Sequence, residues 1–148
     1  MTSELAIAIH TLVFLNHKGD CQSSEKIAEN VCTNPVCIRR ILSKLKKADL
    51  IGTKEGIEGG AYFIREPEAV SLDMVLAALH ETPISVSKRT GDLDMECLIA
   101  SNMAFVMDEI YEKMNKGCIQ KLREITIRDI DERIFGRKQQ DGKEDSKI

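Results

Sequence analysis

The sequence predicts a mainly α-helical fold with one small β-hairpin, on the basis of three observations along residues 23–62. A short apolar-patterned segment is followed by a tight turn. Asn34 and Pro35 then open a basic segment, and a glycine-rich stretch between two short β-prone runs comes next. Asparagine is a favoured N-cap, and proline suits the first helical position because its missing N–H is not needed there. This order of elements is typical of a winged helix-turn-helix.

Hydrophobic density predicts the first helix, and capping residues predict the second. Residues 4–17 carry apolar side chains on more than one side, which favours a helix that is buried over most of its surface. Ser23 can accept a hydrogen bond from the exposed amides of the turn that Ser24 begins, and Glu25 lies favourably beside the positive end of a helix. We therefore expect a second, short helix that ends at about residue 30.

An amphipathic basic helix is predicted after the turn. Apolar residues recur at steps of three and four from Ile38 to Ala48, which gives the helix one inward face, while arginines and lysines occupy its flanks. The whole chain has a net charge of −3, but residues 34–54 contain six basic residues and one acidic residue. Because contacts with phosphates supply the sequence-independent part of DNA affinity, this local charge predicts that the helix binds double-stranded DNA.

A hairpin is predicted from the glycines that follow. Residues 50–54 and 61–64 have the composition of short strands, and residues 56–60 supply glycines that tolerate positive φ. A phosphate-binding loop is the competing interpretation, but the Lys-Ser/Thr pair of that motif is missing and no long helix starts directly after the glycines. Motifs for nucleotide, flavin or zinc catalysis do not occur elsewhere in the sequence, so no enzyme is predicted.

The predicted DNA-binding residues lie mainly at one end of the basic helix. Val36, Arg39 and Arg40 fall in its first turn and a half, the part that a recognition helix inserts deepest into the major groove, and we expect them to read bases. The complete predicted set adds neighbouring helix positions and the wing: Ser24, Asn34, Pro35, Val36, Arg39, Arg40, Lys44, Lys54, Gly59 and Gly60.

Three runs carry a resemblance to a known family: TNPVCIRRIL at residues 33–42, LKKADLI at 45–51 and GIEGGA at 56–61. Over residues 4–134 the chain resembles the Rrf-two family of bacterial winged-helix transcription regulators. Within that family it is similar to the YwnA-like branch, whose helix reads Asn-Pro-Val with Arg-Arg two residues later and whose wing ends in Gly-Gly-Ala. The resemblance implies a DNA-binding transcriptional regulator.

Departures from the family pattern concern the helix end, the wing and the cofactor. Asp49 stands where relatives often have the glycine that ends the recognition helix, and Glu55 stands where many carry an arginine that reaches into the minor groove. The family's sensors hold iron–sulfur clusters with three closely spaced cysteines, whereas only Cys97 lies in the corresponding region here. His10 and His17 have no partners at metal-ligand spacing. We therefore expect neither a cofactor nor a metal.

A long apolar stripe predicts a homodimer. Residues 95–124 carry apolar side chains at steps of three and four, too many for a lone surface helix on a small domain. Two-fold protein symmetry also matches the palindromes that are common in operators. The residues predicted to meet a second copy are Ile99, Met103, Val106, Ile110 and Met114.

Capping residues and composition predict the domain organisation. Ser71 can cap a helix, and Thr126 and Asp129 form a capping-box variant that opens a last short helix to about residue 134. The N-terminus lacks the features of a secretory signal and no apolar run is long enough to span a membrane, so we expect a cytoplasmic protein. The predicted parts are a winged helix-turn-helix domain at 1–80 (helix-turn-helix at about 24–49, wing at about 50–64), a connector at 81–94, a dimerisation helix and short C-terminal helix at 95–134, and a disordered tail at 136–148.

The favoured function is a homodimeric repressor that occludes a palindromic operator, and two alternatives remain open. In the first, the winged helix binds a partner protein or acts with a protein or small-molecule co-regulator. In the second, Cys32 and Cys37, which flank the turn near Arg39 and Arg40, respond to oxidation, because nearby positive charge favours thiolates. Cysteines also serve as small apolar residues, so both roles stay open for this pair.

Overall fold

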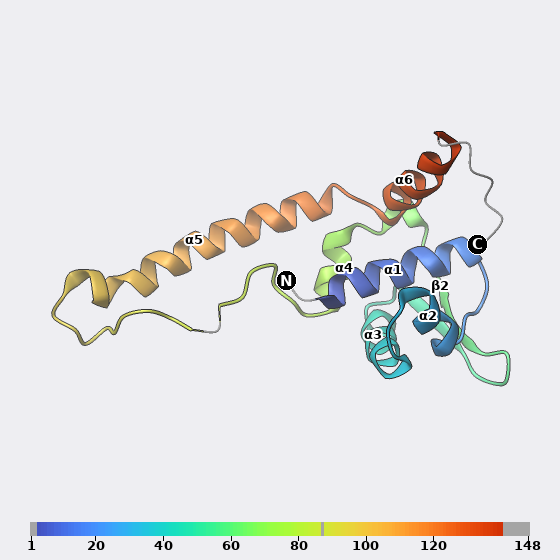
Figure 1. Ribbon diagram of the computed structural model, residues 1–148, viewed down its shortest axis with the longest axis horizontal. Coiled ribbons are helices and arrows are strands. Elements are labelled where there is room, and N and C mark those ends of the chain that lie inside the picture. Colours follow the sequence, from blue (N-terminus) through green and yellow to red (C-terminus); the bar gives the residue numbers. More distant parts are fainter. Residues whose placement is uncertain (1–2, 87, 141–148) are drawn as a thin grey trace.

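Helices dominate the chain in the computed structural model, which describes residues 3–86 and 88–140, the side chains of 137–140 excepted. A two-stranded antiparallel hairpin follows the third helix along the chain and precedes the fourth (Figure 1). In chain order the elements are α1 (Ser3–Lys18), α2 (Ser24–Val31), α3 (Pro35–Lys47), β1 (Ile51–Lys54), β2 (Gly60–Phe63), a 3₁₀ turn η1 (Pro67–Ala69), α4 (Leu72–Ala78), α5 (Leu98–Arg123) and α6 (Ile127–Gln140).

The helix-turn-helix forms with the caps that the sequence predicts. The Ser23 hydroxyl accepts a hydrogen bond from the Lys26 N–H at 3.2 Å, and the Asn34 side-chain oxygen accepts one from the Cys37 N–H at 2.8 Å. Between the two helices, Cys32 adopts a left-handed conformation with φ of 61°. These local hydrogen bonds fix where α2 and α3 begin, and so fix the angle at which α3 leaves the turn.

The hydrophobic core lies around α1, which runs through the middle of the body between α6 on one side and α2 with α3 on the other (Figure 1). Because α1 is covered from several directions, its apolar residues do not form a single stripe, as the density of residues 4–17 predicts. Its largest fully buried partners come from α2, α3, β1, α4 and the start of α6: Ile27, Ile38, Ile41, Leu45, Ile51, Val75 and Ile127.

The hairpin also pairs with the segment before α2, through one isolated antiparallel bridge between Gln22 and Ala61. Ile51 pairs with Phe63 in the antiparallel register, and Gln22 and Ala61 exchange two backbone hydrogen bonds of 2.9 Å. A Cβ on Gly60 would lie 2.1 Å from the Gln22 carbonyl oxygen. Gly60 is therefore required for this close approach, which holds the wing against the helix-turn-helix.

Asp49 follows α3 in a left-handed conformation, with φ of 57°. The Arg65 guanidinium donates a hydrogen bond of 2.9 Å to its backbone carbonyl. Aspartate tolerates this conformation better than most residues, which explains how the helix ends without the family's glycine.

The C-terminal elements differ from the sequence predictions in two places. The capping box forms: the Thr126 N–H donates to the Asp129 carboxylate at 2.8 Å, and the Asp129 N–H donates to the Thr126 hydroxyl at 3.2 Å. However, α6 continues to Gln140, so the prediction of a disordered tail is wrong for residues 136–140, while 141–148 lie outside the described residues. A single glycine, Gly136, weakens a helix by only about 1 kcal/mol and does not end it.

The second difference concerns α4. Ser71 is its N-cap residue, but the serine hydroxyl does not bond to the helix amides. It bonds to the carboxylate of Asp73, which also accepts a hydrogen bond from Arg123 at 3.2 Å. The serine hydroxyl is held as a donor by the charged acceptor two residues away, and its oxygen accepts no hydrogen bond from the helix amides. The contact ties the end of α5 to the start of α4.

Candidate nucleic-acid interface

The outward face of α3 is exposed along the whole helix. Ile38, Ile41 and their apolar neighbours turn inward, so Val36 and the positions four, seven and eleven residues later turn outward. The side chains of this row are exposed, and Val36 is 70% accessible although it is apolar. The row consists of Val36, Arg40, Ser43 and Lys47, with Arg39 beside it.

Two members of this row were missed by the sequence prediction. Ser43 and Lys47 lie on the same face as Val36 and Arg40, and both are exposed. The helical period counted outward from Val36 would have found them, because the inward stripe fixes the opposite face as well. Serine contacts several bases and lysine contacts phosphate, so both types suit a DNA-binding helix.

Arg39 is held by an ion pair across the helix-turn-helix. Its Nη2 donates to Glu25 Oε1 at 2.9 Å, and both side chains are more than half exposed. The pKa of the Glu25 carboxyl is lowered, first by a hydrogen bond from its own backbone N–H at the start of α2 and then by the Arg39 guanidinium. Glu25 is therefore ionised at neutral pH. An exposed pair of this kind is easily exchanged for a contact with DNA.

Arg40 and Lys44 share one carboxylate on α1. Glu4 forms an ion pair with Arg40, whose Nη2 lies 2.8 Å from its Oε1, and accepts a hydrogen bond from Lys44 Nζ at 3.1 Å; the Glu4 side chain is only 18% exposed. Lys44 is thus directed toward α1 and is half-buried, whereas the Arg40 side chain is 60% exposed. Of the two predicted DNA contacts, Arg40 is the better placed to reach a duplex.

The remaining predicted residues of the helix-turn-helix lie at helix starts. Ser24 and Pro35 are half-buried first residues of α2 and α3. Asn34 is exposed, but its side-chain oxygen is used by the Cys37 amide. The amides at these helix starts favour a phosphate nearby because of the positive end of the helix dipole.

The wing carries mixed charge and an apolar tip. Lys54 and Glu55 are both exposed, and Ile57 at the tip is fully exposed. Gly59, like Gly60, is explained by packing, because a Cβ there would lie 2.2 Å from the Lys54 carbonyl oxygen. Since a carboxylate is repelled by phosphate, Lys54 is the wing's one basic side chain for a phosphate contact.

Both cysteines of the turn are free thiols. Cys32 is exposed, and its sulfur lies 3.7 Å from the Glu29 carbonyl oxygen. Cys37 is half-buried in the first turn of α3, and its sulfur lies 4.0 Å from Nη2 of Arg40. A change of charge or size at Cys37 would therefore act directly on the position of the Arg40 side chain.

No group of three or more His, Cys, Asp or Glu side chains that could hold a metal ion occurs in the described part of the chain. The Nε2 of His10 donates to the Asn30 side-chain oxygen at 2.8 Å, and His17 stacks on Phe135. Both histidines thus contact neighbouring side chains. In residues 3–86 and 88–140, no helix is long and apolar enough to cross a membrane.

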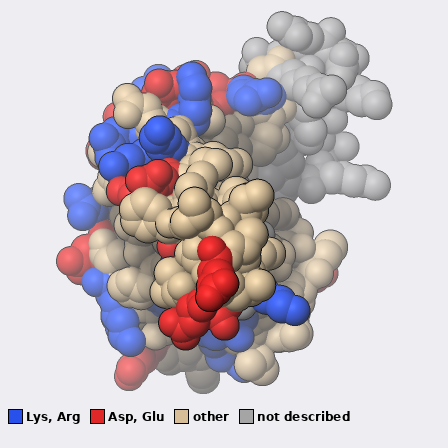
Figure 2. Space-filling model, turned by 90° about the vertical axis from the view of Figure 1, so that its left-hand side faces the viewer, with Lys and Arg blue, Asp and Glu red and all other residues tan. Residues whose placement is uncertain are grey.

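The predicted dimerisation residues lie on α5, which leaves the body as a long arm (Figure 1). Among the described side chains of this helix none is buried. Seen from the end where α5 begins, the tip of the arm is largely uncharged with a narrow acidic band (Figure 2). Each predicted residue exposes 39–70% of its surface in the single chain: Ile99, Met103, Val106, Ile110 and Met114.

Known proteins resemble this chain in sequence and in fold. A family model described as Rrf2, iron-dependent transcriptional regulator, matches residues 1–133. A Bacillus subtilis (strain 168) protein, provisionally named the HTH-type transcriptional regulator YwnA, is 31% identical over 144 residues, 91% of this chain and 99% of that protein. A crystal structure provisionally described as a DNA-binding protein is 30% identical, with a TM-score of 0.68 over 86% of this chain and 98% of its own.

A third relative shows the fold alone. It is a Lactobacillus plantarum structure, provisionally described as a transcriptional regulator, at 21% identity and a TM-score of 0.76 over 97% of this chain and 100% of its own. Together with the outward basic face of α3, these matches identify the chain as a member of the Rrf2 family of winged helix-turn-helix proteins, and as a DNA-binding transcriptional regulator.

Proposed function

We propose that this chain is a cytoplasmic, homodimeric repressor that occludes a palindromic operator and has no enzymatic role. The observation that carries the DNA-binding part is the exposed row on α3, in which Val36 and Arg40 are presented outward beside Arg39. Those residues offer one apolar contact for a thymine methyl group and two guanidinium groups for guanine or phosphate. Ser43 and Lys47 extend the same surface.

The homodimer is supported by the exposed apolar side of α5. A helix of 26 residues is about 39 Å long, and its apolar residues are left in water by a single chain. Since a contiguous exposed apolar surface of this kind is unusual for a monomer, a second copy packed along α5 is the economical solution. It would also place two α3 helices on the two halves of a palindrome.

The DNA-binding proposal is tested by titrating the protein onto a duplex from its own upstream region at several salt concentrations. Phosphate contacts predict a steep fall in affinity, with a slope of about −0.9 for each phosphate neutralised. Arg39→Ala should weaken binding by about 5- to 150-fold, the equivalent of roughly 1–3 kcal/mol for a bidentate base contact. Affinity that hardly depends on salt would instead support the alternative of an apolar interface with a partner protein.

The dimer is tested by sedimentation of the full chain. Ile110→Glu should convert dimers to monomers, because it places a charge in the apolar contact, whereas Glu112→Gln on the same helix should leave the dimer intact. A wild-type monomer at concentrations that saturate the operator would contradict the proposed assembly.

Thiol-based regulation is a second candidate, favoured by the 4.0 Å approach of the Cys37 sulfur to Arg40. Oxidation to a sulfenic acid or a mixed disulfide would add bulk beside a predicted base contact. The test compares operator binding before and after oxidation in the wild type and in Cys37→Ser. Equal losses in the two proteins would remove Cys37 from any switch.

Iron dependence, which the family is described as having, is not part of the function proposed for this chain. A resident iron centre needs several thiolate, imidazole or carboxylate ligands, and no group of three or more such side chains placed to hold a metal occurs among the described residues, at Cys97 or elsewhere. The donor set of a single chain therefore does not fit an iron centre, and no part of the proposed mechanism uses one.

A further inference from the structure

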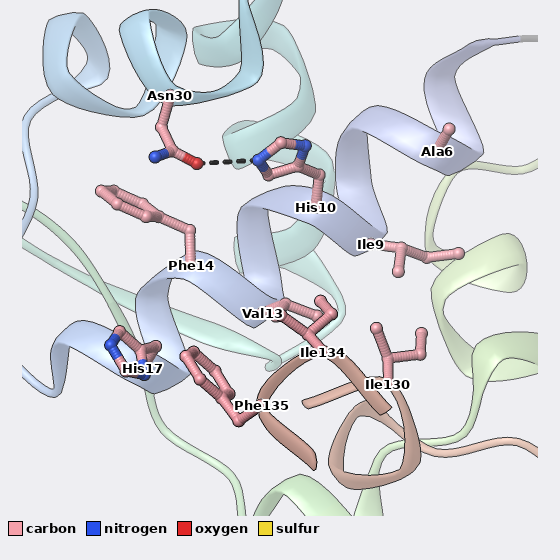
Figure 3. A pocket seen from close by; sticks show the side chains of 10 residues that line it. All are labelled: Ala6, Ile9, His10, Val13, Phe14, His17, Asn30, Ile130, Ile134 and Phe135. Carbon is pink, nitrogen blue, oxygen red and sulfur yellow. Dashed lines mark hydrogen bonds between the residues drawn. The ribbon is translucent and has the colours of Figure 1, made fainter. Parts of the chain in front are cut away.

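A groove lies along α1, between the C-terminal end of α2 and helix α6 (Figure 3). Its volume is about 560 Å³, which falls within the range of roughly 300–1,000 Å³ found for sites that bind small molecules. The side chains around it come from all three helices: Ala6, Ile9, His10, Val13, Phe14, His17, Asn30, Ile130, Ile134 and Phe135.

Most of this lining is apolar and part of it is flat. Ile9 and Ile130 lie at one end, and the aromatic rings of Phe14 and Phe135 lie toward the other (Figure 3). The His17 ring stacks on Phe135, with ring centroids 4.5 Å apart and an angle of 15° between the planes. Stacked faces of this kind favour a planar aromatic group over a branched aliphatic one.

The Asn30 amide and the nearby Lys18 ammonium group place two donors at the aromatic end of the groove. The Asn30 side-chain oxygen is occupied by His10, while its amide nitrogen, on the Phe14 side in Figure 3, has no hydrogen-bond partner among the residues that the structure describes. The Lys18 ammonium group lies 5.7 Å from the centre of the Phe14 ring. The ten lining residues include no carboxylate; Asp131 of α6 is not among them. This end of the groove is therefore complementary to an acceptor with negative charge.

We propose that this groove is a binding site for a small aromatic carboxylate, whose ring lies against Phe14 and Phe135 and whose carboxylate accepts a hydrogen bond from the Asn30 amide. The site lies outside the DNA-binding surface and adds a ligand to the proposed function. A second copy of the chain is the rival occupant, because the groove is apolar and open to solvent. The test below separates the two.

The experiment measures binding of 2-naphthoate to the full chain by calorimetry, with 2-naphthylmethylammonium as the probe of opposite charge. Asn30→Asp keeps the shape and an acceptor for His10, but replaces the free donor with a carboxylate. Ile134→Trp fills the groove from a position that is 44% exposed, so the fold should tolerate it. The matched control is Ile57→Trp at the wing tip, which is fully exposed.

The proposal expects one saturable 2-naphthoate site per chain and binding of the ammonium probe at least tenfold weaker. Asn30→Asp should weaken 2-naphthoate at least tenfold, Ile134→Trp should abolish binding, and Ile57→Trp should change nothing. The proposal is overturned if no saturable binding occurs, if both probes bind equally, or if Ile134→Trp binds like the wild type. Absent binding together with a change in oligomeric state for Ile134→Trp would assign the groove to a second copy.

A regulatory consequence follows, which rests on the proposed function. Asn30 lies two residues before Cys32, where the chain turns toward α3, so a ligand held by Asn30 acts on the element that orients the recognition helix. Saturating 2-naphthoate should therefore change operator affinity in the wild type and leave it unchanged in Asn30→Asp. Ligand binding with no effect on operator affinity would overturn this coupling but not the site, because the calorimetry contains no DNA.

Discussion

Removing the charge of Glu4 should make the protein less stable and its DNA binding stronger. Glu4 is mostly buried and forms ion pairs with Arg40 and Lys44, so Glu4→Gln keeps the shape and one acceptor but loses the ionic part of both contacts. Charge-assisted hydrogen bonds contribute roughly 1 kcal/mol more than neutral ones, and solvent screens most of that at Arg40. We expect the free energy of unfolding to fall by about 1 kcal/mol and the melting temperature to fall by about 4 °C.

The effect on DNA has the opposite sign. When Arg40 bridges a phosphate and Glu4, the carboxylate and the phosphate lie two hydrogen-bond lengths apart, about 6 Å, and repel each other by about 0.7 kcal/mol in water. Glu4→Gln removes this repulsion, so operator affinity should rise about threefold for each half-site at low salt and by less at 0.2 M, where charges are screened. Fluorescence anisotropy on a labelled operator duplex measures the affinity at both salt concentrations, and calorimetry measures the melting temperature.

The control is Glu68→Gln, which changes the net charge of the chain by the same amount on η1, where Glu68 is half-exposed and 3.9 Å from Arg128. It should alter operator affinity far less than Glu4→Gln. If Glu4→Gln binds no better than the wild type while its circular dichroism is native, Arg40 and Lys44 are not limited by Glu4 and the reasoning fails.

Three further predictions concern stability. Gly60→Ala should lower the melting temperature markedly, because its Cβ would lie 2.1 Å from the Gln22 carbonyl oxygen; an unchanged melting temperature would show that the wing is not held by this contact. Gly136→Ala, in open space on α6, should instead stabilise by about 0.5–1 kcal/mol, and a destabilised variant would contradict a continuous helix there. The pKa of Asp129 is lowered, first by the hydrogen bond from the Thr126 backbone N–H and then by the Thr126 hydroxyl. Because the folded pKa lies below the unfolded one, this stabilisation is complete above about pH 4 and is lost on further acidification, so chemical denaturation of Asp129→Asn should show a weaker pH dependence in that range.

Local rules account for most of the helix-turn-helix. The caps at Ser23 and Asn34 and the inward stripe of α3 follow from interactions within a few residues, and the structure confirms them. The same holds for the capping box of Thr126 and Asp129. Such features are visible in the sequence because donor, acceptor and spacing all lie within one turn of helix.

Contacts between distant residues could not be predicted in this way. The pairing of Gln22 with Ala61 brings the Gln22 backbone so close to Gly60 that no side chain fits there, and the hairpin sequence alone does not indicate this contact. The ion pairs of Glu4 join the first turn of α1 to α3, 40 residues later for Lys44. Helix α6 is also longer than the sequence predicts, since a glycine such as Gly136 stops a helix only where the surrounding structure offers an alternative.

The ion pairs on α3 also bear on specificity. Arg39, Arg40 and Lys44 each have a carboxylate partner, and Lys46 Nζ donates to Thr53 at 2.8 Å. Among the basic residues of this helix, only Lys47 has neither an ion pair nor a side-chain hydrogen bond in the described part of the chain. A phosphate contact by Arg39, Arg40 or Lys44 either breaks the ion pair or brings the phosphate close to its carboxylate. Either cost weakens non-specific binding throughout a genome.

An operator that offers bases as well as phosphates compensates for the broken pairs, and random duplex does not. The carboxylates of Glu4 and Glu25 should therefore raise the ratio of specific to non-specific affinity while they lower both affinities. On this reasoning Glu4→Gln binds random duplex with a larger relative gain than operator, and anisotropy with both duplexes at one salt concentration measures the ratio. A gain confined to the operator would show that Glu4 opposes base contacts rather than phosphate contacts.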